Sequence, residues 1–87
     1  MPERRVTVAS KVGLHARPAA LVAKAAAATP VTITIRKEGA DPVEAASILG
    51  LMTLGAGFGD EVVLTADGAG AETALEELAG LIGSELD

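Results

Sequence analysis

The chain has 87 residues, of which 49 % are hydrophobic, and Phe58 is its only aromatic residue. Seven basic residues against twelve acidic ones give a net charge of −5, which is the wrong sign for a nucleic-acid backbone, and one aromatic ring cannot form a base-stacking platform. The chain has no cysteine and a single histidine, His15, so we expect no disulfide, no metal site and no nucleic-acid partner. The length predicts one domain over residues 1–87.

The N-terminus opens with Met1 and Pro2 followed by charged residues, without the apolar segment of a secretion signal. The longest alanine-rich stretch, residues 16–28, is interrupted by two basic residues and a proline. We therefore expect no membrane insertion and no secretion, and we predict a cytoplasmic protein.

Four segments have the alternation or the β-branched composition of strands: residues 4–9, 31–37, 41–44 and 60–66. In the second, Val31, Ile33 and Ile35 fall on one face, as expected for a sheet that is buried on one side only. Pro42 cannot donate a ladder hydrogen bond, so the third segment predicts an edge strand.

Three further segments predict helices: residues 16–28, 47–54 and 71–86. The first is dominated by alanine and carries Pro18 in its first turn, where a missing N–H costs nothing, and Pro30 ends it. The second is apolar on more than one side and is followed by glycines. The third is amphipathic, because its large apolar side chains recur at helical spacing.

The elements therefore follow the order β-α-β-β-α-β-α. Strands with one apolar face need helices on that face only. We predict an α+β fold, an open-faced β-sandwich in which three helices lie on one face of a four-stranded antiparallel sheet.

His15 is the one side chain of a type that ordinarily titrates near neutrality, and it stands directly before the helix predicted from Ala16. The free N–H groups of Ala16, Arg17 and the rest of the first turn, together with the positive end of the helix dipole, favour an anion there. The Arg17 guanidinium adds a planar donor suited to phosphate oxygens. These features predict an anion or phosphoryl site, although His15 as a surface or capping residue is the common alternative.

Residues 13–19 (Gly-Leu-His-Ala-Arg-Pro-Ala) resemble the active-site signature of HPr, the histidine-containing phosphocarrier family of the bacterial phosphoenolpyruvate-dependent sugar phosphotransferase system. Residues 47–55 resemble that family's regulatory-serine helix, and the predicted element order equals the family fold. The resemblance implies that His15 accepts a phosphoryl group on Nδ1 from phosphorylated enzyme I and passes it to the IIA domain of a sugar permease. Arg17 would neutralise charge on the transferred group, and no metal or organic cofactor is needed.

Two surfaces are candidates for partner binding. Helical spacing places Arg17, Ala20, Lys24 and Ala27 on one face of the first helix, which would be small-residued and positive. In the second helix we expect Leu49 and Met52 to form an exposed apolar patch, and we assign Ile48 and Leu51 to the core. A shuttle of this kind is expected to be a monomer with brief protein contacts.

Ser47 stands just before the second helix, where a serine is a common N-cap. The resemblance also implies a regulatory role, because in some lineages a kinase phosphorylates the matching serine and weakens docking to enzyme I. Ala46 precedes Ser47 where many regulated members carry a basic residue, and one extra residue separates Gly39 from Ser47. Both departures put phosphorylation by a serine kinase in doubt.

Two other functions remain open. A regulatory or nitrogen-branch paralogue would use its phosphorylation state as a signal, and only partner choice distinguishes it from a sugar carrier. A plain interaction domain would use the patch within residues 48–54 and would not need His15. An independent hydrolase or transferase is disfavoured, because the sequence neighbours of His15 supply no base and orienting group.

Overall fold

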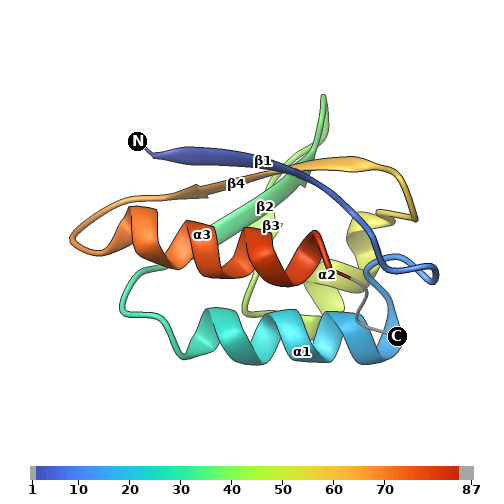
Figure 1. The fold of residues 1–87 in the computed structure, drawn as a ribbon, viewed down its shortest axis with the longest axis horizontal. Coiled ribbons are helices and arrows are strands. Elements are labelled where there is room, and N and C mark those ends of the chain that lie inside the picture. The colour runs from blue at the N-terminus through green and yellow to red at the C-terminus, as the bar shows by residue number, and fades with distance from the viewer. Residues whose placement is uncertain (1, 85–87) are drawn as a thin grey trace.

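The computed structural model describes residues 2–84, which form one sheet and three helices in the predicted order. The elements are β1 (Glu3–Thr7), α1 (Ala16–Ala27), β2 (Ile33–Lys37), β3 (Val43–Glu44), α2 (Ile48–Leu54), β4 (Glu61–Ala66) and α3 (Ala71–Ile82). The sheet is antiparallel with strand order β1-β4-β2-β3, and Figure 1 shows the helices together on one of its faces. The predicted open-faced sandwich is confirmed, including the edge position of the short strand β3.

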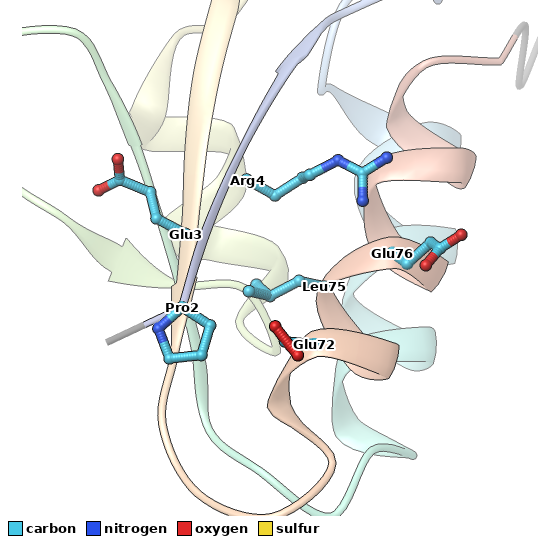
Figure 2. Close-up of a pocket in the computed structure, with 6 residues that line it drawn as sticks. All are labelled: Pro2, Glu3, Arg4, Glu72, Leu75 and Glu76. Carbon is cyan, nitrogen blue, oxygen red and sulfur yellow. The ribbon is translucent and has the colours of Figure 1, made fainter.

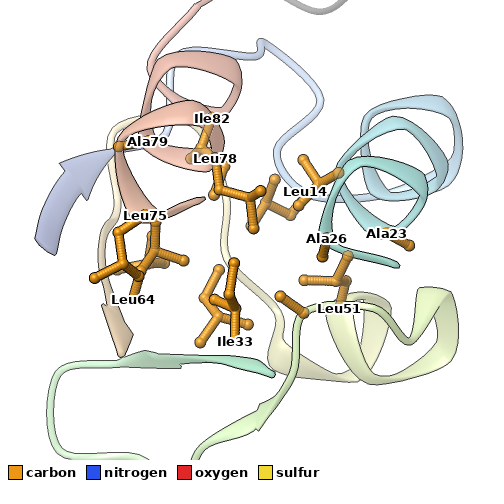
Figure 3. Close-up of a cluster of buried hydrophobic side chains, with 14 of the residues drawn as sticks. Leu14, Ala23, Ala26, Ile33, Leu51, Leu64, Leu75, Leu78, Ala79 and Ile82 are labelled. Carbon is orange, nitrogen blue, oxygen red and sulfur yellow. The ribbon is translucent and has the colours of Figure 1, made fainter. Parts of the chain in front are cut away.

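The core lies between the sheet and the helices. Leu51 of α2, Leu64 of β4 and Leu78 of α3 are fully buried there, and Figure 3 shows them around one apolar cluster. On α1 the buried side chains are mostly small, namely Pro18, Ala19, Val22, Ala23 and Ala26. Small side chains let α1 approach the rest of the core closely, which explains how an alanine-rich chain fills its interior without aromatic rings.

Val63 is an exception to the one-sided sheet. It alternates with the core residues Val62 and Leu64 and so faces the side without helices, yet it is 0 % exposed. The register places Arg5 and Arg36 on either side of it. Long arginine side chains can cover apolar surface with their aliphatic parts while the guanidinium groups stay in water. Val63 is therefore a buried apolar residue on the open face, between two arginines of the neighbouring strands.

Four predicted boundaries were wrong by at least two residues. The first strand ends at Thr7 and not at Ala9, because the Ala9 N–H leaves the sheet and donates to the carbonyl of Ile82 at the end of α3. The second strand begins at Ile33 and not at Val31, and the third begins at Val43 and not at Asp41. The last helix ends at Ile82, where a turn at Gly83 follows, so the expected helical residue Ser84 lies beyond it. The expected positions 85 and 86 lie outside the described residues.

Helix α2 begins and ends with local signals that the sequence carries. The Ser47 hydroxyl oxygen accepts a hydrogen bond of 2.9 Å from the Gly50 N–H, which confirms Ser47 as the N-cap. Gly55 ends the helix with φ +72°, a left-handed conformation that glycine adopts without strain. In the described part of the chain, no helix is both long and apolar enough to cross a membrane.

Candidate functional site

His15 occupies the N-cap position of α1 and is exposed. Its backbone is extended, with φ −139° and ψ 152°, and its side chain makes no capping hydrogen bond to the helix. The alternative role of a capping residue is therefore not fulfilled. The imidazole stays available at the surface, next to backbone donors that its own side chain does not satisfy.

The surroundings of His15 favour an anion. No acidic residue lies in the first turn of α1, so no carboxylate of that turn neutralises the positive end of this 12-residue helix. Arg17 is exposed in the same turn and forms no ion pair with any residue of the described chain. Its guanidinium can therefore turn toward a group bound at His15.

Ala16, which follows His15, has a backbone φ of +48°. Among the described residues it is the one non-glycine with positive φ. An alanine in this region costs about 1–3 kcal/mol, and such strain persists only where the surrounding structure imposes it. The turn from the loop into α1 is therefore held by tertiary contacts and not by local preference.

Residues 55–60, which we call the brace loop, contact the two residues before His15. The Ala56 carbonyl accepts a hydrogen bond of 2.9 Å from the N–H of Leu14, the residue before His15. Gly13 lies so close that a Cβ on it would come within 2.5 Å of the Ala56 carbonyl oxygen. Leu14 itself is 2 % exposed and extends into the core beside Leu78 (Figure 3). The two residues before His15 are thus held in place, Gly13 by the brace loop and Leu14 by both the brace loop and the core.

Sequence analysis missed the brace loop and considered Gly13 only as the first residue of the signature at residues 13–19. The signal that could have drawn attention was the glycine itself, because glycine adopts a positive φ, such as the +72° found here, without strain. Nothing in the sequence says that the partner of this glycine is Ala56.

Asp60 closes the brace loop. Its carboxylate accepts a hydrogen bond of 2.9 Å from the Gly57 N–H, and its Oδ2 lies 3.6 Å from the Lys37 Nζ. The hydrogen bond from Gly57, followed by the charge of Lys37, holds the pKa of the Asp60 carboxyl below its usual range. The loop behind His15 is therefore tied by an ionised carboxylate.

We expect the Asp60→Asn variant to be less stable than the parent chain at pH 7 and equally stable at low pH. The folded-state pKa of Asp60 is lowered, so its stabilising effect is complete above the unfolded value of about 4 and is lost as pH falls through the folded value. Urea unfolding at several pH values, followed by far-ultraviolet circular dichroism, measures the difference. A gap between the two proteins that stays constant down to pH 2 would contradict this assignment. Asp41→Asn serves as a control for charge alone, because Asp41 is exposed and its carboxylate has no hydrogen bond or ion pair within the described chain.

The expected docking surface on α1 is exposed as predicted, whereas the expected apolar patch on α2 differs from the prediction. Ala20, Lys24 and Ala27 are exposed on α1 together with Arg17, as the helical spacing predicted. Leu49 is 72 % exposed, but Met52 is only half-buried against the core, so it contributes less to an apolar patch than expected. Ile48, which we assigned to the core, is 48 % exposed, because the first turn of α2 buries no side chain fully and the helix packs through Leu51.

Two more exposed apolar side chains belong to the loops around His15. Val12 is 61 % exposed three residues before it, and Phe58 is 66 % exposed in the brace loop. Sequence analysis named neither as a surface residue. With Ile48 and Leu49 they add apolar surface on the two loops and on the first turn of α2.

A pocket lies elsewhere, between the start of β1 and the start of α3 (Figure 2). Its volume is about 410 Å³, and it is lined by Pro2, Glu3, Arg4, Glu72, Leu75 and Glu76. Three carboxylates against one guanidinium make it unsuited to an anion. His15 is instead exposed on the surface, where another protein can reach it.

The class of protein follows from this fold and from comparison with known proteins. A family model described as "PTS HPr component phosphorylation site" matches residues 2–84. The phosphocarrier protein HPr of Streptomyces coelicolor is 52 % identical over 87 residues, covering 100 % of this chain and 94 % of that protein. The phosphocarrier protein NPr of Shewanella violacea is 39 % identical and covers 98 % of this chain and 92 % of that protein.

Solved structures agree with the sequence comparison. The crystal structure of a phosphocarrier protein HPr from Bacillus anthracis superposes with a TM-score of 0.87 at 43 % identity, covering 93 % of this chain and 95 % of that one. The chain therefore belongs to the HPr family of the phosphotransferase system, whose members are phosphocarrier proteins and not turnover enzymes.

Proposed function

We propose that this chain accepts a phosphoryl group on His15 from phosphorylated enzyme I and passes it to IIA domains of sugar permeases in the cytoplasm. The observation that carries the proposal is the exposed, uncapped His15 at the start of α1, with Arg17 unpaired in the same turn. Membership of the HPr family supports the carrier role.

In the proposed step, the lone pair of a neutral imidazole nitrogen of His15 attacks the phosphorus of a phosphohistidine on enzyme I. A new P–N bond forms on His15 while the P–N bond to the donor histidine breaks, and the donor imidazole leaves with that electron pair. The transferred group carries its charge on the outer oxygens, so the chain has to align the nitrogen and balance charge. Arg17 and the N-terminal end of α1 supply that charge balance.

Partner exchange uses the surface around His15. The exposed face of Arg17, Ala20, Lys24 and Ala27 steers acidic partner surfaces toward the site, and Leu49, with Met52 at its edge, supplies apolar contact. Donor and acceptor need the same histidine in turn, so we propose that the monomer is the working form.

We also propose that phosphorylation of Ser47 by a serine kinase lowers affinity for enzyme I. The Ser47 hydroxyl oxygen is the acceptor for Gly50 N–H, and it adjoins the exposed Ile48 and Leu49. A phosphate there would place about two negative charges beside the apolar contact and oppose docking by desolvation.

A second candidate is a regulatory or nitrogen-branch role, in which the phosphorylated chain is a signal for other proteins. The similarity to a protein named NPr favours it, and the chemistry at His15 would be the same. Capture of partners by the phosphorylated and unphosphorylated chain would separate the two roles.

We expect one acid-labile phosphoryl group on the parent chain after incubation with phosphoenolpyruvate and a bacterial enzyme I. The His15→Ala variant should take up none, because the accepting nitrogen is missing. Intact-mass measurement and site mapping provide the readout, with circular dichroism to show that both proteins are folded. If a folded parent chain gains no phosphate from several enzyme I proteins, the carrier function is wrong and a plain interaction domain takes its place.

A further inference from the structure

We propose that Asp60 is a positioning residue for phosphoryl transfer at His15. Its carboxylate holds the brace loop in one conformation, and the brace loop in turn holds the backbone that carries the histidine. This inference rests on the proposed carrier function and adds to it a residue that lies outside the signature around His15.

The first step runs from Asp60 to the loop. The carboxylate accepts the Gly57 N–H at 2.9 Å, and the Asp60 N–H donates to the Gly57 carbonyl at 3.0 Å. These two hydrogen bonds close the turn from residue 57 to residue 60. A glycine-rich segment, with Gly55, Gly57 and Gly59, has many accessible conformations, so such a closure selects one of them.

The second step runs from the loop to the histidine. The Ala56 carbonyl accepts the Leu14 N–H at 2.9 Å, and Gly13 packs directly against Ala56 and Gly57. At the other end, the Val8 N–H donates to the Asp60 carbonyl and the Gly59 N–H donates to the Val8 carbonyl, both at 2.9 Å. The brace loop therefore holds both ends of the segment that leads from β1 to His15.

Lys37, at the end of β2, anchors this arrangement to the sheet. Its Nζ lies 3.6 Å from Asp60 Oδ2 and donates to the Gly55 carbonyl at 3.5 Å. One ammonium group thus contacts both ends of the brace loop. The contacts are long and partly exposed, so we assign Lys37 a smaller part than the hydrogen bond from Gly57.

The expected consequence is a loss of transfer rate without a loss of docking. A displacement of about 1 Å at a reacting group can cost about 100-fold in rate. Asp60 is not one of the α1 or α2 residues that we assign to partner contact. Variants of Asp60 should therefore lower the maximal rate constant and leave the half-saturating concentration unchanged.

The test measures single-turnover transfer from phosphorylated enzyme I to increasing concentrations of the chain by rapid quench. Asp60→Asn and Asp60→Leu form a matched pair of similar shape and equal charge, which differ in whether an oxygen remains to accept the Gly57 N–H. We expect Asp60→Leu to lower the maximal rate about tenfold and Asp60→Asn to recover most of it, on the scale that misplaced reacting groups show. Glu61→Gln makes the same charge change at a carboxylate that pairs with Arg5 instead, and should transfer like the parent chain.

The outcomes are distinguishable. Equal maximal rates for the Asn and Leu variants, or a change confined to the half-saturating concentration, would overturn the positioning role while the parent chain still carries phosphate. Failure of the parent chain to accept phosphate would instead remove the carrier function itself. Should Asp60→Leu not fold, Asp60→Ala removes the same acceptor with less apolar surface, and the same comparison with Asp60→Asn applies.

Discussion

Replacing Gly13 with alanine is expected to destabilise the chain by about 2–5 kcal/mol. A left-handed conformation costs an L residue about 1–2 kcal/mol, and forcing a side chain into occupied space costs about 1–3 kcal/mol more. Gly13 incurs both, because its φ is +72° and its added Cβ would lie 2.5 Å from the Ala56 carbonyl oxygen. A domain of this size has about 4–13 kcal/mol of stability in total, so the loss is a large fraction of it.

Gly39→Ala is the matched control for this prediction. Gly39 has φ +80° with no atom within 4 Å of its added Cβ, so it carries the conformational cost alone. Urea unfolding followed by circular dichroism suits both variants, because the chain has no tryptophan or tyrosine to report by fluorescence. Equal losses at the two glycines would show that the contact between Gly13 and the brace loop carries no energy. The folded fraction of Gly13→Ala should also accept phosphate slowly, since the displaced backbone leads directly to His15.

Truncating Leu51 to alanine is the second change with a large expected effect, a loss of about 2–5 kcal/mol. Leu51 is the one fully buried side chain of α2 and joins that helix to the common core (Figure 3). Removing its branched end leaves a cavity that close-packed neighbours fill only in part. Thermal or urea unfolding measures the loss.

Leu49→Ala provides the contrast within the same helix. Leu49 is 72 % exposed, so its truncation should change stability by about 0.5 kcal/mol or less. The same variant should bind enzyme I more weakly if Leu49 contributes to docking as proposed. If Leu49→Ala proves as destabilising as Leu51→Ala, α2 must lie in a different orientation from the one described.

One part of the candidate site could be predicted from the sequence, and the other part could not. His15, Arg17 and the helix that begins at Ala16 are near neighbours, so spacing and the rules for helix ends predict their arrangement. The brace loop is distant in the chain from His15, and no local rule links Ala56 or Asp60 to it. The exposed Ile48 and the half-buried Met52 were misassigned for a related reason. Helical spacing says which residues share a face, but the packing of a helix decides how far each one is buried.

The sequence by itself determined the order and type of the elements, the turn signals at Ser47 and Gly55, and the histidine at the head of a helix. These depend on periodicity, capping and backbone preference, which act over a few residues. The tertiary structure alone decided the burial of Val63 between two arginines of the neighbouring strands, the strained backbone of Ala16 and the contact of Gly13 with Ala56. Each of these requires segments far apart in the chain to meet, and only the packing of the sheet against its helices brings them together.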